Sequence, residues 1–477
     1  MTQQTRHTNR MDKEALQLYF DTIASKRTKW KRKNKTYHKL LERYFSFIVP
    51  KDSKVLEIGC GTGDLLAALK PSYGVGVDFS SKTIEIAKAN HPNLEFIVQD
   101  AHTLQLNETF DYVILSDLVG SLWDIQQVFD ALKGVCHDRT RIIISYYNFL
   151  WEPLMRFGER IGLKQKQPLQ NWLSTKDITN LLQLSGIETV RTDKKILMPK
   201  YIPLLSELFN NYFANLPLFK AFSLSNFIIA RPKSEQTTEY SVSIVVPARN
   251  EKGNIENAIL TTPMFGSAQE FVFVEGHSAD GTYEEMLRVQ AKYTDKNIKV
   301  IRQSGKGKGN AVRDGFEIST GDILFILDAD LTTPPQDMPK FYEALRTNRG
   351  EFINGCRLVY PMEKQAMRFL NLIANKFFGI AFSFLLGQRL KDTLCGTKVL
   401  FKKDYEIIKA NRSYFGDFDP FGDFDLLFGA AKLNMKMVEI NVRYKDRQYG
   451  TTQISRFKHG LLLIRMTIFA SRKLKFF

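Results

Sequence analysis

Residues 55–66, VLEIGCGTGDLL, join a run of apolar residues directly to three glycines at positions 59, 61 and 63. Apolar runs alternate with amphipathic stretches from about Lys54 onward, as far as SNFIIARP at residues 225–232. Strands that alternate with helices in this way form a parallel sheet with helices on both faces. The stretch therefore predicts an α/β domain in which a strand ends at a glycine-rich turn and a helix follows.

The same alternation begins again at residues 241–251, SVSIVVPARNE. Between the two, residues 231–240, RPKSEQTTEY, are polar and contain a proline, as is typical of a linker. We therefore predict two α/β domains, over residues 1–232 and 241–477, joined by a linker over residues 233–240. A chain of 477 residues fits this division, because single cores stop growing at about 250 to 300 residues.

Cysteine content, the first residues and the longest apolar run exclude several protein classes. The four cysteines show no paired spacing, so neither a zinc site nor a disulfide framework is predicted, and a reducing, cytoplasmic setting fits. The first residues are polar and lack the pattern of a signal peptide. The longest apolar run, residues 377–387, is well short of the ~20 residues that span a bilayer, so no transmembrane helix is expected.

Positive charge is concentrated in two runs. The chain has a net charge of +16; residues 26–43 contain nine Lys or Arg against one Glu, and residues 443–477 contain nine against one Asp. A solvated helix face is the simplest interpretation of the first run. The total charge still predicts a negatively charged partner, which could be nucleic acid, an anionic lipid surface or a phosphorylated substrate.

Two acidic residues follow the next two predicted strands of the first half. Asp78 lies in GVGVDFS at residues 74–80, and Asp100 ends LEFIVQD at residues 94–100. Open α/β sheets bind ligands at the carboxyl edge of their strands. Glycines let the backbone approach a ligand there, beside the free N–H groups of the following helix. We therefore predict a ligand site formed by the glycine turn and the two acids.

With Glu57 added, these residues resemble the first motifs of the class I S-adenosylmethionine-dependent methyltransferases, over roughly residues 35–232. The resemblance implies a Rossmann-like fold that binds S-adenosylmethionine, with Asp78 on the ribose hydroxyls and Asp100 near the adenine amine. The cofactor-binding residues under this interpretation are Glu57, Gly59, Gly61, Gly63, Asp78, Asp100 and Asp117.

These motifs do not predict the methyl acceptor. After the fourth predicted strand, residues 116–124, SDLVGSLWD, lack the Asn/Asp-Pro-Pro-Tyr signature of many amino methylases. Asp117 and Trp123 are candidate pocket residues, and ordinary loop packing is the alternative for both. Methyl transfer mainly requires alignment of the acceptor with the methyl group, so the chemistry adds little further constraint.

Carboxylates also follow the predicted strands of the second half. Residues 323–335, ILFILDADLTTPP, end an apolar run at Asp328 and Asp330. Two carboxylates one residue apart can hold a hard divalent cation, Mg²⁺ or Mn²⁺, whose shell is completed by substrate phosphates. Such a metal neutralises a diphosphate leaving group. A helix cap or a turn is the alternative for an exposed pair of aspartates.

Three motifs follow one another here: SVSIVVPARNE at residues 241–251, GKGKGNAVRDG at residues 305–315 and ILFILDADLTTPP at residues 323–335. Their order resembles that of the family-two glycosyltransferases of GT-A fold, over roughly residues 240–458. The resemblance implies a nucleotide-sugar site in which Asp328 and Asp330 are the catalytic metal ligands. The nucleotide-sugar-binding residues under this interpretation are Pro247, Asn250, Glu251, Glu275, Lys308, Arg313 and Asp328. Glu275 stands where the family usually has aspartate, so the nucleotide base and the sugar stay open.

Three later motifs, INGCR at 353–357, DTLCGTKV at 392–399 and RQYGTTQI at 447–454, resemble the branch that glycosylates polyprenyl phosphates. The resemblance implies that Arg357 helps to hold the acceptor phosphate. Arg368 and Arg447 could supply further bidentate donors. Asp423 is a candidate general base for a hydroxyl acceptor, whereas an ionised phosphate needs little base assistance.

Two apolar segments interrupted by polar or charged residues, 367–387 and 456–477, predict helices that lie in a membrane interface. Buried core helices are the alternative, because short apolar runs do not distinguish the two. The protein is therefore predicted to be cytoplasmic and peripheral on the cytosolic face of a membrane.

We predict a bifunctional transferase that methylates one acceptor and transfers a sugar from a nucleotide donor to a polyprenyl phosphate. Alternatives stay open: glycosyl transfer to a hydroxyl of a cell-envelope glycan, a basic nucleic-acid-binding protein, or a membrane-surface scaffold with one degenerate domain. Nucleic-acid binding would explain the charge but not the ordered acids at the sheet edges, so no nucleic-acid partner is expected. Salt-dependent binding to unrelated DNA would favour that alternative.

Overall fold

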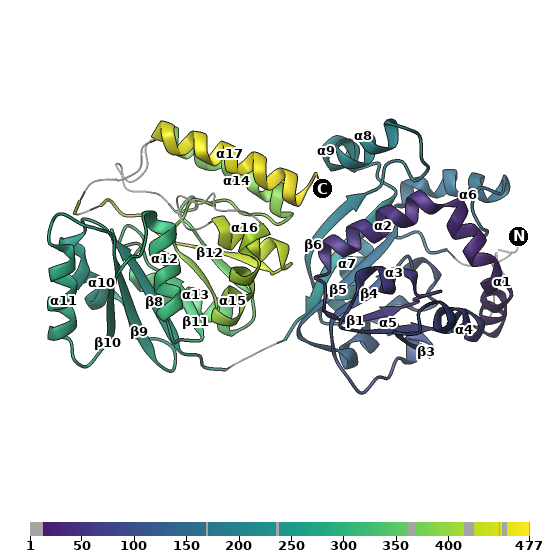
Figure 1. Cartoon of the computed structure of the whole chain (residues 1–477), viewed down its shortest axis with the longest axis horizontal. Helices are drawn as coiled ribbons and strands as arrows, with labels where there is room; N and C mark the ends of the chain where they lie inside the picture. Colours follow the sequence, from purple (N-terminus) through teal and green to yellow (C-terminus); the bar gives the residue numbers. More distant parts are fainter. Residues whose placement is uncertain are drawn as a thin grey trace, which may run out of the picture. The chain divides into compact units, whose positions relative to one another are not determined.

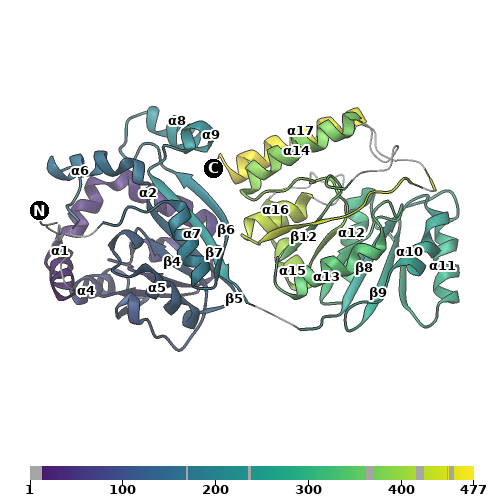
Figure 2. The ribbon, with the colours of Figure 1, turned by 180° about the vertical axis from the view of Figure 1, so that it is seen from behind.

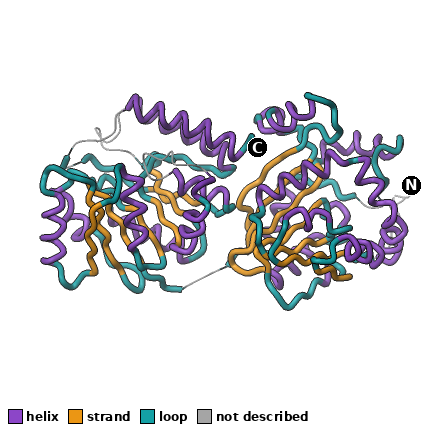
Figure 3. The backbone as a smooth tube through the Cα atoms, viewed as in Figure 1, coloured by secondary structure: helices purple, strands orange, loops and turns teal. Residues whose placement is uncertain are grey.

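The computed structural model describes residues 13–167, 170–234, 238–360, 369–414, 424–447, 449–450 and 456–476. The chain divides into two compact units, Met1–Lys233 and Ser234–Phe477. Within the described residues, each unit contains one seven-stranded sheet with helices around it (Figures 1 and 3). The predicted α/β fold class is therefore confirmed for both units.

The sheet of the N-terminal unit has the strand order β3-β2-β1-β4-β5-β7-β6. Its strands are β1 Lys54–Ile58, β2 Tyr73–Asp78, β3 Glu95–Val98, β4 Phe110–Ser116, β5 Cys136–Tyr147, β6 Ile187–Lys195 and β7 Ser225–Pro232. Its helices are α1 Lys13–Lys33, α2 Lys35–Ile48, α3 Asp64–Leu69, α4 Ser81–Asn90, α5 Ile125–Ala131, α6 Glu152–Arg160, α7 Thr175–Leu184, α8 Leu205–Asn211 and α9 Pro217–Lys220. The sheet is mixed, not wholly parallel as predicted, because β7 runs antiparallel to both β5 and β6.

Continuous apolar runs form the central strands of this sheet because helices cover both of its faces. Val55, Leu56 and Ile58 of β1 are completely buried, as are Ile142 and Ile144 of β5. Strands β1, β2 and β4 are parallel, so their carboxyl ends lie at one edge of the sheet. The glycine turn and the acidic residues predicted from the sequence are therefore brought to the same edge.

The sheet of the C-terminal unit has the order β10-β9-β8-β11-β13-β12-β14. Its strands are β8 Val242–Ala248, β9 Gln269–Glu275, β10 Asn297–Arg302, β11 Ile323–Ile326, β12 Phe352–Cys356, β13 Lys398–Phe401 and β14 Met437–Asn441. Its helices are α10 Ile255–Thr261, α11 Thr282–Lys292, α12 Gly307–Ile318, α13 Met338–Arg346, α14 Phe369–Leu386, α15 Lys402–Ala410, α16 Phe424–Lys432 and α17 Arg456–Leu474. Strands β8, β9, β10 and β11 are parallel, and β13 runs antiparallel to its neighbours. The carboxyl ends of β8, β9 and β11 consequently share one edge.

The polar segment between the units begins later than its composition indicates. Arg231 and Pro232 belong to β7, although the segment RPKSEQTTEY looked like a linker throughout. The Arg231 side chain is completely buried, and its Nε donates to Glu188 Oε1 of the neighbouring strand at 2.6 Å. A charged residue can complete a strand in this way when a carboxylate on the adjacent strand pairs with it.

Helices α14 and α17 pack against one another on the C-terminal unit, and both views show them side by side (Figures 1 and 2). Among the residues that the structure describes, no helix combines the length and the apolar character needed to cross a membrane. Both helices expose apolar side chains, such as Phe377 and Ile380 on α14 and Leu461, Ile464 and Ile468 on α17.

Candidate active sites

A cavity of about 1150 Å³ lies at the carboxyl edge of the sheet in the N-terminal unit. It is lined by the ends of β1, β2 and β4 and by residues of α1 and α2. The residues predicted from the sequence that line it are Glu57, Gly59, Gly61, Asp78, Asp100, Asp117 and Trp123. Gly63 does not line the cavity but is the N-cap residue of α3. The structure thus brings nearly all of the predicted residues into one cavity.

Two positions in the turn after β1 favour glycine. At Gly59 the backbone is left-handed (φ +72°), and a Cβ atom would lie 2.7 Å from the Leu118 side chain. At Gly61 the backbone is also left-handed (φ +55°), and the nearest side chain is that of Arg27 in α1. The backbone N–H of Gly61 donates to Asp78 Oδ2 at 3.0 Å. The turn therefore orients the carboxylate of Asp78 through the backbone.

Asp78 is held mainly by backbone N–H groups, whereas Asp100 is held by one backbone N–H and two side chains. Asp78 Oδ1 accepts from the N–H of Ser80 at 3.0 Å, and its nearest cation, the Arg27 guanidinium, is 3.8 Å away. Asp100 Oδ1 accepts from the N–H of His102 at 3.0 Å and contacts His102 Nδ1 at 2.7 Å. Lys13 forms an ion pair with Asp100. Such contacts fix the direction of both carboxylates without fully neutralising Asp78.

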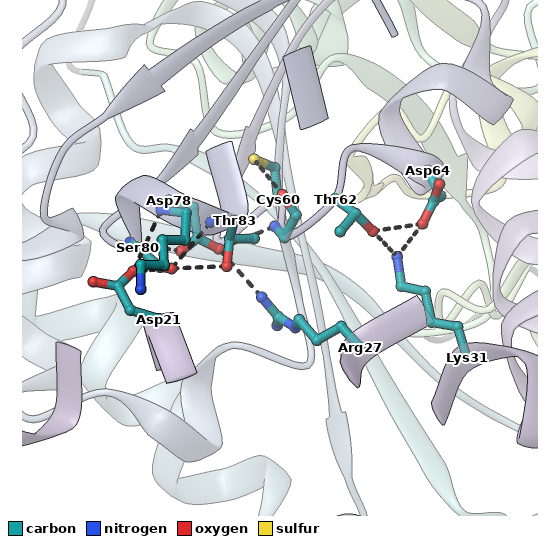
Figure 4. A network of polar contacts seen from close by, with 11 residues as sticks. Asp21, Arg27, Lys31, Cys60, Thr62, Asp64, Asp78, Ser80 and Thr83 are labelled. Atoms are coloured by element: carbon teal, nitrogen blue, oxygen red, sulfur yellow. Dashed lines mark hydrogen bonds and ion pairs between the residues drawn. The ribbon is translucent and has the colours of Figure 1, made fainter. Parts of the chain in front are cut away.

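Helix α1 contributes polar side chains to this edge of the sheet (Figure 4). Lys31 donates to Thr62 Oγ1 at 2.8 Å and also pairs with Asp64 at the start of α3. Ser80 Oγ donates to Asp21 at 2.6 Å. Arg27 and Lys31 are among the cavity-lining residues. The first basic run is therefore not only a solvated helix face, because part of it points into the cavity.

Glu57 and Asp117 are carboxylates whose surroundings disfavour their charge. Burial raises the pKa of Glu57 to about 8, against the opposing effects of Lys31 and of the Leu66 N–H that it accepts at 3.1 Å. Burial also raises the pKa of Asp117, against hydrogen bonds from Tyr37 at 2.7 Å and Ser145 at 3.2 Å. Asp117 has a left-handed backbone, with φ of 53°. Burial and these hydrogen bonds hold Asp117 in one orientation at the wall of the cavity.

A histidine of α2, His38, also lines the cavity. Burial and the nearby charge of Lys31 lower the pKa of His38 to about 4. His38 is therefore neutral at neutral pH, and its low pKa makes it a weak base there.

The acids of the C-terminal unit are each paired with a cation. Asp328 Oδ1 lies 2.5 Å from Lys308 Nζ, at the start of α12. Asp330 Oδ2 lies 2.5 Å from Arg447 Nη2, and its Oδ1 accepts from Thr332 Oγ1 at 2.9 Å. Burial alone would raise the pKa of Asp328, but Lys308, Arg357 and Lys398 together outweigh it, and the pKa lies below its ordinary value. Asp328 is therefore held in the charged form.

Arg447 joins two of the predicted acids. Its Nη1 donates to Glu251 Oε1 at 2.6 Å while its Nη2 donates to Asp330. Burial raises the pKa of Glu251, and the charge of Arg447 opposes that effect. A guanidinium between two carboxylates marks a position where this edge of the sheet accommodates positive charge.

The other predicted residues of this unit lie around the same edge. Asn250 Oδ1 accepts from the N–H of Ala279 at 2.9 Å, and Glu275 Oε1 accepts from the N–H of Ser278 at 2.5 Å. The first contact joins the ends of β8 and β9, and the second lies within the turn that follows β9. Pro247 is the penultimate residue of β8. Arg313 lies 3.8 Å from Asp425 of α16.

Arg357 is committed to a buried ion pair. Its Nε and Nη2 donate to Asp392 at 2.7 and 2.9 Å, in a bidentate contact. Its charge also contributes to lowering the pKa of Asp328, which places it near the acidic pair. Arg368 and Asp423 lie outside the described residues.

Two family descriptions match the chain, one in each unit. "Methyltransferase domain" matches residues 55–138 and "Glycosyl transferase family 2" matches residues 243–407. We call the N-terminal unit, which contains the methyltransferase match, the methyltransferase unit, and the C-terminal unit, which contains the family-two match, the glycosyltransferase unit. The predicted resemblance to the two families is confirmed.

Curated relatives match the glycosyltransferase unit. The chain is 36% identical over 175 residues to the dolichol-phosphate mannosyltransferase of Pyrococcus furiosus, covering 36% of this chain and 49% of the relative. It is 23% identical over 237 residues to the undecaprenyl-phosphate 4-deoxy-4-formamido-L-arabinose transferase of Pectobacterium carotovorum, covering 46% and 64%. The chain therefore spans less than two thirds of the length of these relatives.

A solved structure matches the methyltransferase unit. A SAM-dependent methyltransferase from Thermotoga maritima aligns with 46% of this chain and 100% of its own, with 17% identity and a TM-score of 0.37.

Several cavity residues of the methyltransferase unit were missed in the sequence. They include Arg27, Lys31 and His38, which come from α1 and α2. Arg27 and Lys31 are four residues apart on one face of α1, so helical periodicity within the basic run was the signal available. That signal does not say which face of a helix meets a ligand, because the contact with the glycine turn depends on tertiary packing.

Two aspartates of the glycosyltransferase unit, Asp328 and Asp330, are of the ligand type that a hard divalent metal prefers. Among the described residues, no group of three His, Cys, Asp or Glu side chains is arranged to hold a metal ion. Asp328 and Asp330 supply only oxygen ligands, and the cations on them show that both carboxylates face positive charge. A hard cation bound there would complete its shell with phosphate and water, as Mg²⁺ commonly does.

Proposed function

We propose that this chain carries out two transfers. The methyltransferase unit, residues 1–232, transfers a methyl group from S-adenosylmethionine. The glycosyltransferase unit, residues 241–477, transfers a sugar from a nucleotide donor to a polyprenyl phosphate at the cytosolic surface of a membrane. The observation that carries the proposal is the arrangement of acids at the carboxyl edges of both sheets, next to a glycine turn in one and a lysine-bearing helix start in the other.

In the methyltransferase unit, Asp78 is the group that supports cofactor binding most directly. Its carboxylate is oriented by two backbone N–H groups and lies in the cavity, so it is able to accept hydrogen bonds from ribose hydroxyls. Asp100 lies on the neighbouring loop, where the adenine amine would be. Glu57, held by the Leu66 N–H, supports the turn from behind. The cavity is large enough for a ligand of this size.

In the glycosyltransferase unit, Asp328 and Asp330 would hold Mg²⁺ or Mn²⁺, which supplies charge neutralisation for a diphosphate leaving group. Lys308 lies beside Asp328 at the N-terminus of α12, where backbone N–H groups also favour phosphate. Glycine at position 396 is required by close packing, because a Cβ atom there would lie 2.0 Å from Asp328 Oδ2 and 2.5 Å from Lys308 Nζ. We propose that the nucleotide diphosphate binds between these groups.

Three observations support a lipid-linked acceptor. The relatives are named for dolichol phosphate and undecaprenyl phosphate. Exposed apolar side chains on α14 and α17 lie beside exposed cations, which is typical of interfacial helices. Arg357 lies near the acidic pair and uses Nε and Nη2 for Asp392, which leaves Nη1 for a phosphate. Arg447 could exchange its two carboxylates for phosphate when the donor and metal bind.

The deciding experiment is to incubate the full chain with S-adenosylmethionine, a panel of nucleotide sugars and a polyprenyl-phosphate-containing lipid extract. We expect mass spectrometry to detect a glycosylated polyprenyl phosphate, and chelation by EDTA to abolish it reversibly. Sugar transferred only to a soluble hydroxyl acceptor would overturn the lipid assignment and leave the glycosyltransferase assignment intact. Product formation that persists in EDTA would overturn the metal.

A further inference from the structure

Two long connections of the methyltransferase unit carry an unusual number of exposed apolar side chains. One follows β5 and contains α6; the other joins β6 to β7 and contains α8 and α9. In the first, the exposed apolar residues are Phe149, Leu150, Leu154, Phe157, Ile161 and Leu163. In the second, they are Tyr201, Ile202, Leu204, Leu205, Leu208, Tyr212, Leu216, Leu218 and Phe222. Leu204 and Leu218 are 81% and 73% exposed, so most of the surface of these two side chains is uncovered within the unit.

The topology places both connections at one edge of the sheet. β5 and β6 end at the carboxyl edge, and β7, antiparallel to both, begins there. The cavity lies at the same edge, and Lys164, Gln165 and Gln167, which follow α6, line it. The apolar residues therefore lie at the same edge of the sheet as the cavity, and the segment after α6 contributes to its wall.

The basic junction between α1 and α2 connects the two apolar segments. Lys33 Nζ donates to the carbonyl of Gly162, at the end of the α6 segment. Lys200 Nζ, just before α8, donates to the carbonyl of Lys33 at 3.1 Å and to Asn34 Oδ1 at 2.7 Å. Arg43 of α2 donates to Asn211 of α8 at 3.0 Å. The two apolar segments and the junction thus form one continuous surface, which we name the carboxyl-edge face.

The charge on this face selects its partner. Residues 26–35 of the junction carry seven Lys or Arg and no acid, whereas the two arginines of α6 are balanced by Glu152 and Glu159. A surface that exposes Leu, Phe and Tyr side chains around such cations matches the interface of an anionic bilayer, where apolar groups enter the acyl boundary and cations meet the headgroups. Nucleic acid would use the cations but would leave the aliphatic side chains in water.

We propose that the methyltransferase unit binds an anionic lipid bilayer through the carboxyl-edge face and that its methyl acceptor is anchored in that bilayer. The second part rests on the proposed methyltransferase function. The junction and the segment after α6 both contribute residues to the cavity wall, so an acceptor held at the lipid surface would lie at the same edge of the sheet as the cavity. This membrane contact is separate from the one proposed for α14 and α17 of the glycosyltransferase unit.

Site-specific fluorescence on the full chain tests the face without interference from α17. In a Cys136→Ala background, where the other three cysteines are buried, single cysteines replace Phe157 and Leu204 and carry a polarity-sensitive dye. Leu184→Cys is the matched control, because Leu184 is 62% exposed but ends α7 at the opposite edge of the sheet. Ile464→Cys reports on α17.

With vesicles of phosphatidylglycerol and phosphatidylcholine, the dyes at 157 and 204 should shift to the blue and be quenched by spin-labelled lipid, while the dye at 184 stays unchanged. Vesicles of pure phosphatidylcholine should give a weaker response. With the vesicles that contain phosphatidylglycerol, the double variant Arg156→Glu with Arg160→Glu should also weaken the response. No response at 157 and 204, whether or not the dye at 464 responds, would overturn the proposal. So would dyes already shielded without lipid, which would show that protein covers the face, or shielding by duplex DNA instead of vesicles.

Titration of S-adenosylmethionine into the same labelled proteins separates the two proposals. Lipid responses at 157 and 204 without cofactor binding would leave the face intact and refute the proposed methyl transfer. Cofactor binding without lipid responses would refute the proposed face and leave the proposed methyl transfer intact.

Discussion

The carboxyl edges of the two sheets both collect acids, but they hold them differently. In the methyltransferase unit, Asp78 receives two backbone N–H groups, and its nearest cation is 3.8 Å away. In the glycosyltransferase unit, Asp328 and Asp330 are each 2.5 Å from a side-chain cation. An edge that binds neutral hydroxyls needs an oriented acceptor, whereas one that binds a metal and a diphosphate needs charges that can be exchanged. The proposed ligands follow from that difference.

The largest effect is expected at the acidic pair of the glycosyltransferase unit, where the charges can be exchanged. Asp330→Asn keeps the shape of the side chain but removes the charge that faces Arg447 and the proposed metal. We expect sugar transfer to fall about 100-fold or more, the scale of losing one group that stabilises developing charge. Product formed per unit time from the nucleotide-sugar panel measures it. Asp337→Asn, which removes only a contact with Lys340, is the control and should retain activity. Full activity of Asp330→Asn in the presence of EDTA would break the comparison.

The next effect tests the oriented edge. Asp78→Ala removes a charged hydrogen-bond partner for the ribose, which should weaken S-adenosylmethionine binding by about 1.5 to 3 kcal/mol, or about tenfold or more. Isothermal titration of the full chain measures the affinity. Asp130→Ala, which removes an exposed contact with Lys133, should bind as the parent does. An unchanged affinity in Asp78→Ala would show that the backbone-held carboxylate has no role in the cofactor site.

A third effect, on stability instead of activity or binding, concerns the buried acid behind each edge. Burial raises the pKa of Glu57 from 4.5 to about 8, so between these values the folded chain keeps a proton that the unfolded chain has lost. Stability should therefore fall as pH rises through this window, by at most about 1.4 kcal/mol per pH unit. Glu57→Gln should flatten the dependence, measured by urea unfolding of the methyltransferase transition at pH 5 to 8. Parallel curves for parent and variant would show that Glu57 is ionised in the fold.

Glu251 of the other edge sharpens this contrast. Burial also raises its pKa, but Arg447 opposes the effect through a 2.6 Å contact. Replacing Glu251 would therefore leave a guanidinium without one of its partners, whereas replacing Glu57 removes an acid that has only a backbone donor.

The smallest effect is expected at Lys13. Its side chain is 63% exposed, and its ion pair with Asp100 is of the surface type that contributes about 0 to 1 kcal/mol. Lys13→Ala should change S-adenosylmethionine affinity by no more than about threefold, measured by titration at low and high salt. A larger change would show that α1 cations control this edge, and would make the two edges more alike than the distances indicate.

Local patterns were sufficient to predict both α/β units and most of the acids that lie at the carboxyl edges of their sheets. A strand that ends in glycines or in DAD carries its chemistry with it, because the carboxyl ends of parallel strands meet wherever the sheet forms. The cavity of the methyltransferase unit accordingly contains Glu57, Asp78 and Asp100. The mixed pairing of β7 was not predicted, because strand direction depends on the length and path of connections that carry no periodic signal.

The partners of those acids were decided by the tertiary structure alone. Arg447 is 117 residues from Asp330 along the chain, and Arg27 reaches Asp78 from a helix whose composition resembles a solvated face. The carboxyl-edge face likewise combines segments around residues 33, 162 and 200. Contacts between distant segments depend on how the layers pack, and single residues show only that a charge or an apolar side chain needs a partner. The sequence determined which groups line the edges, and packing determined which charges they meet.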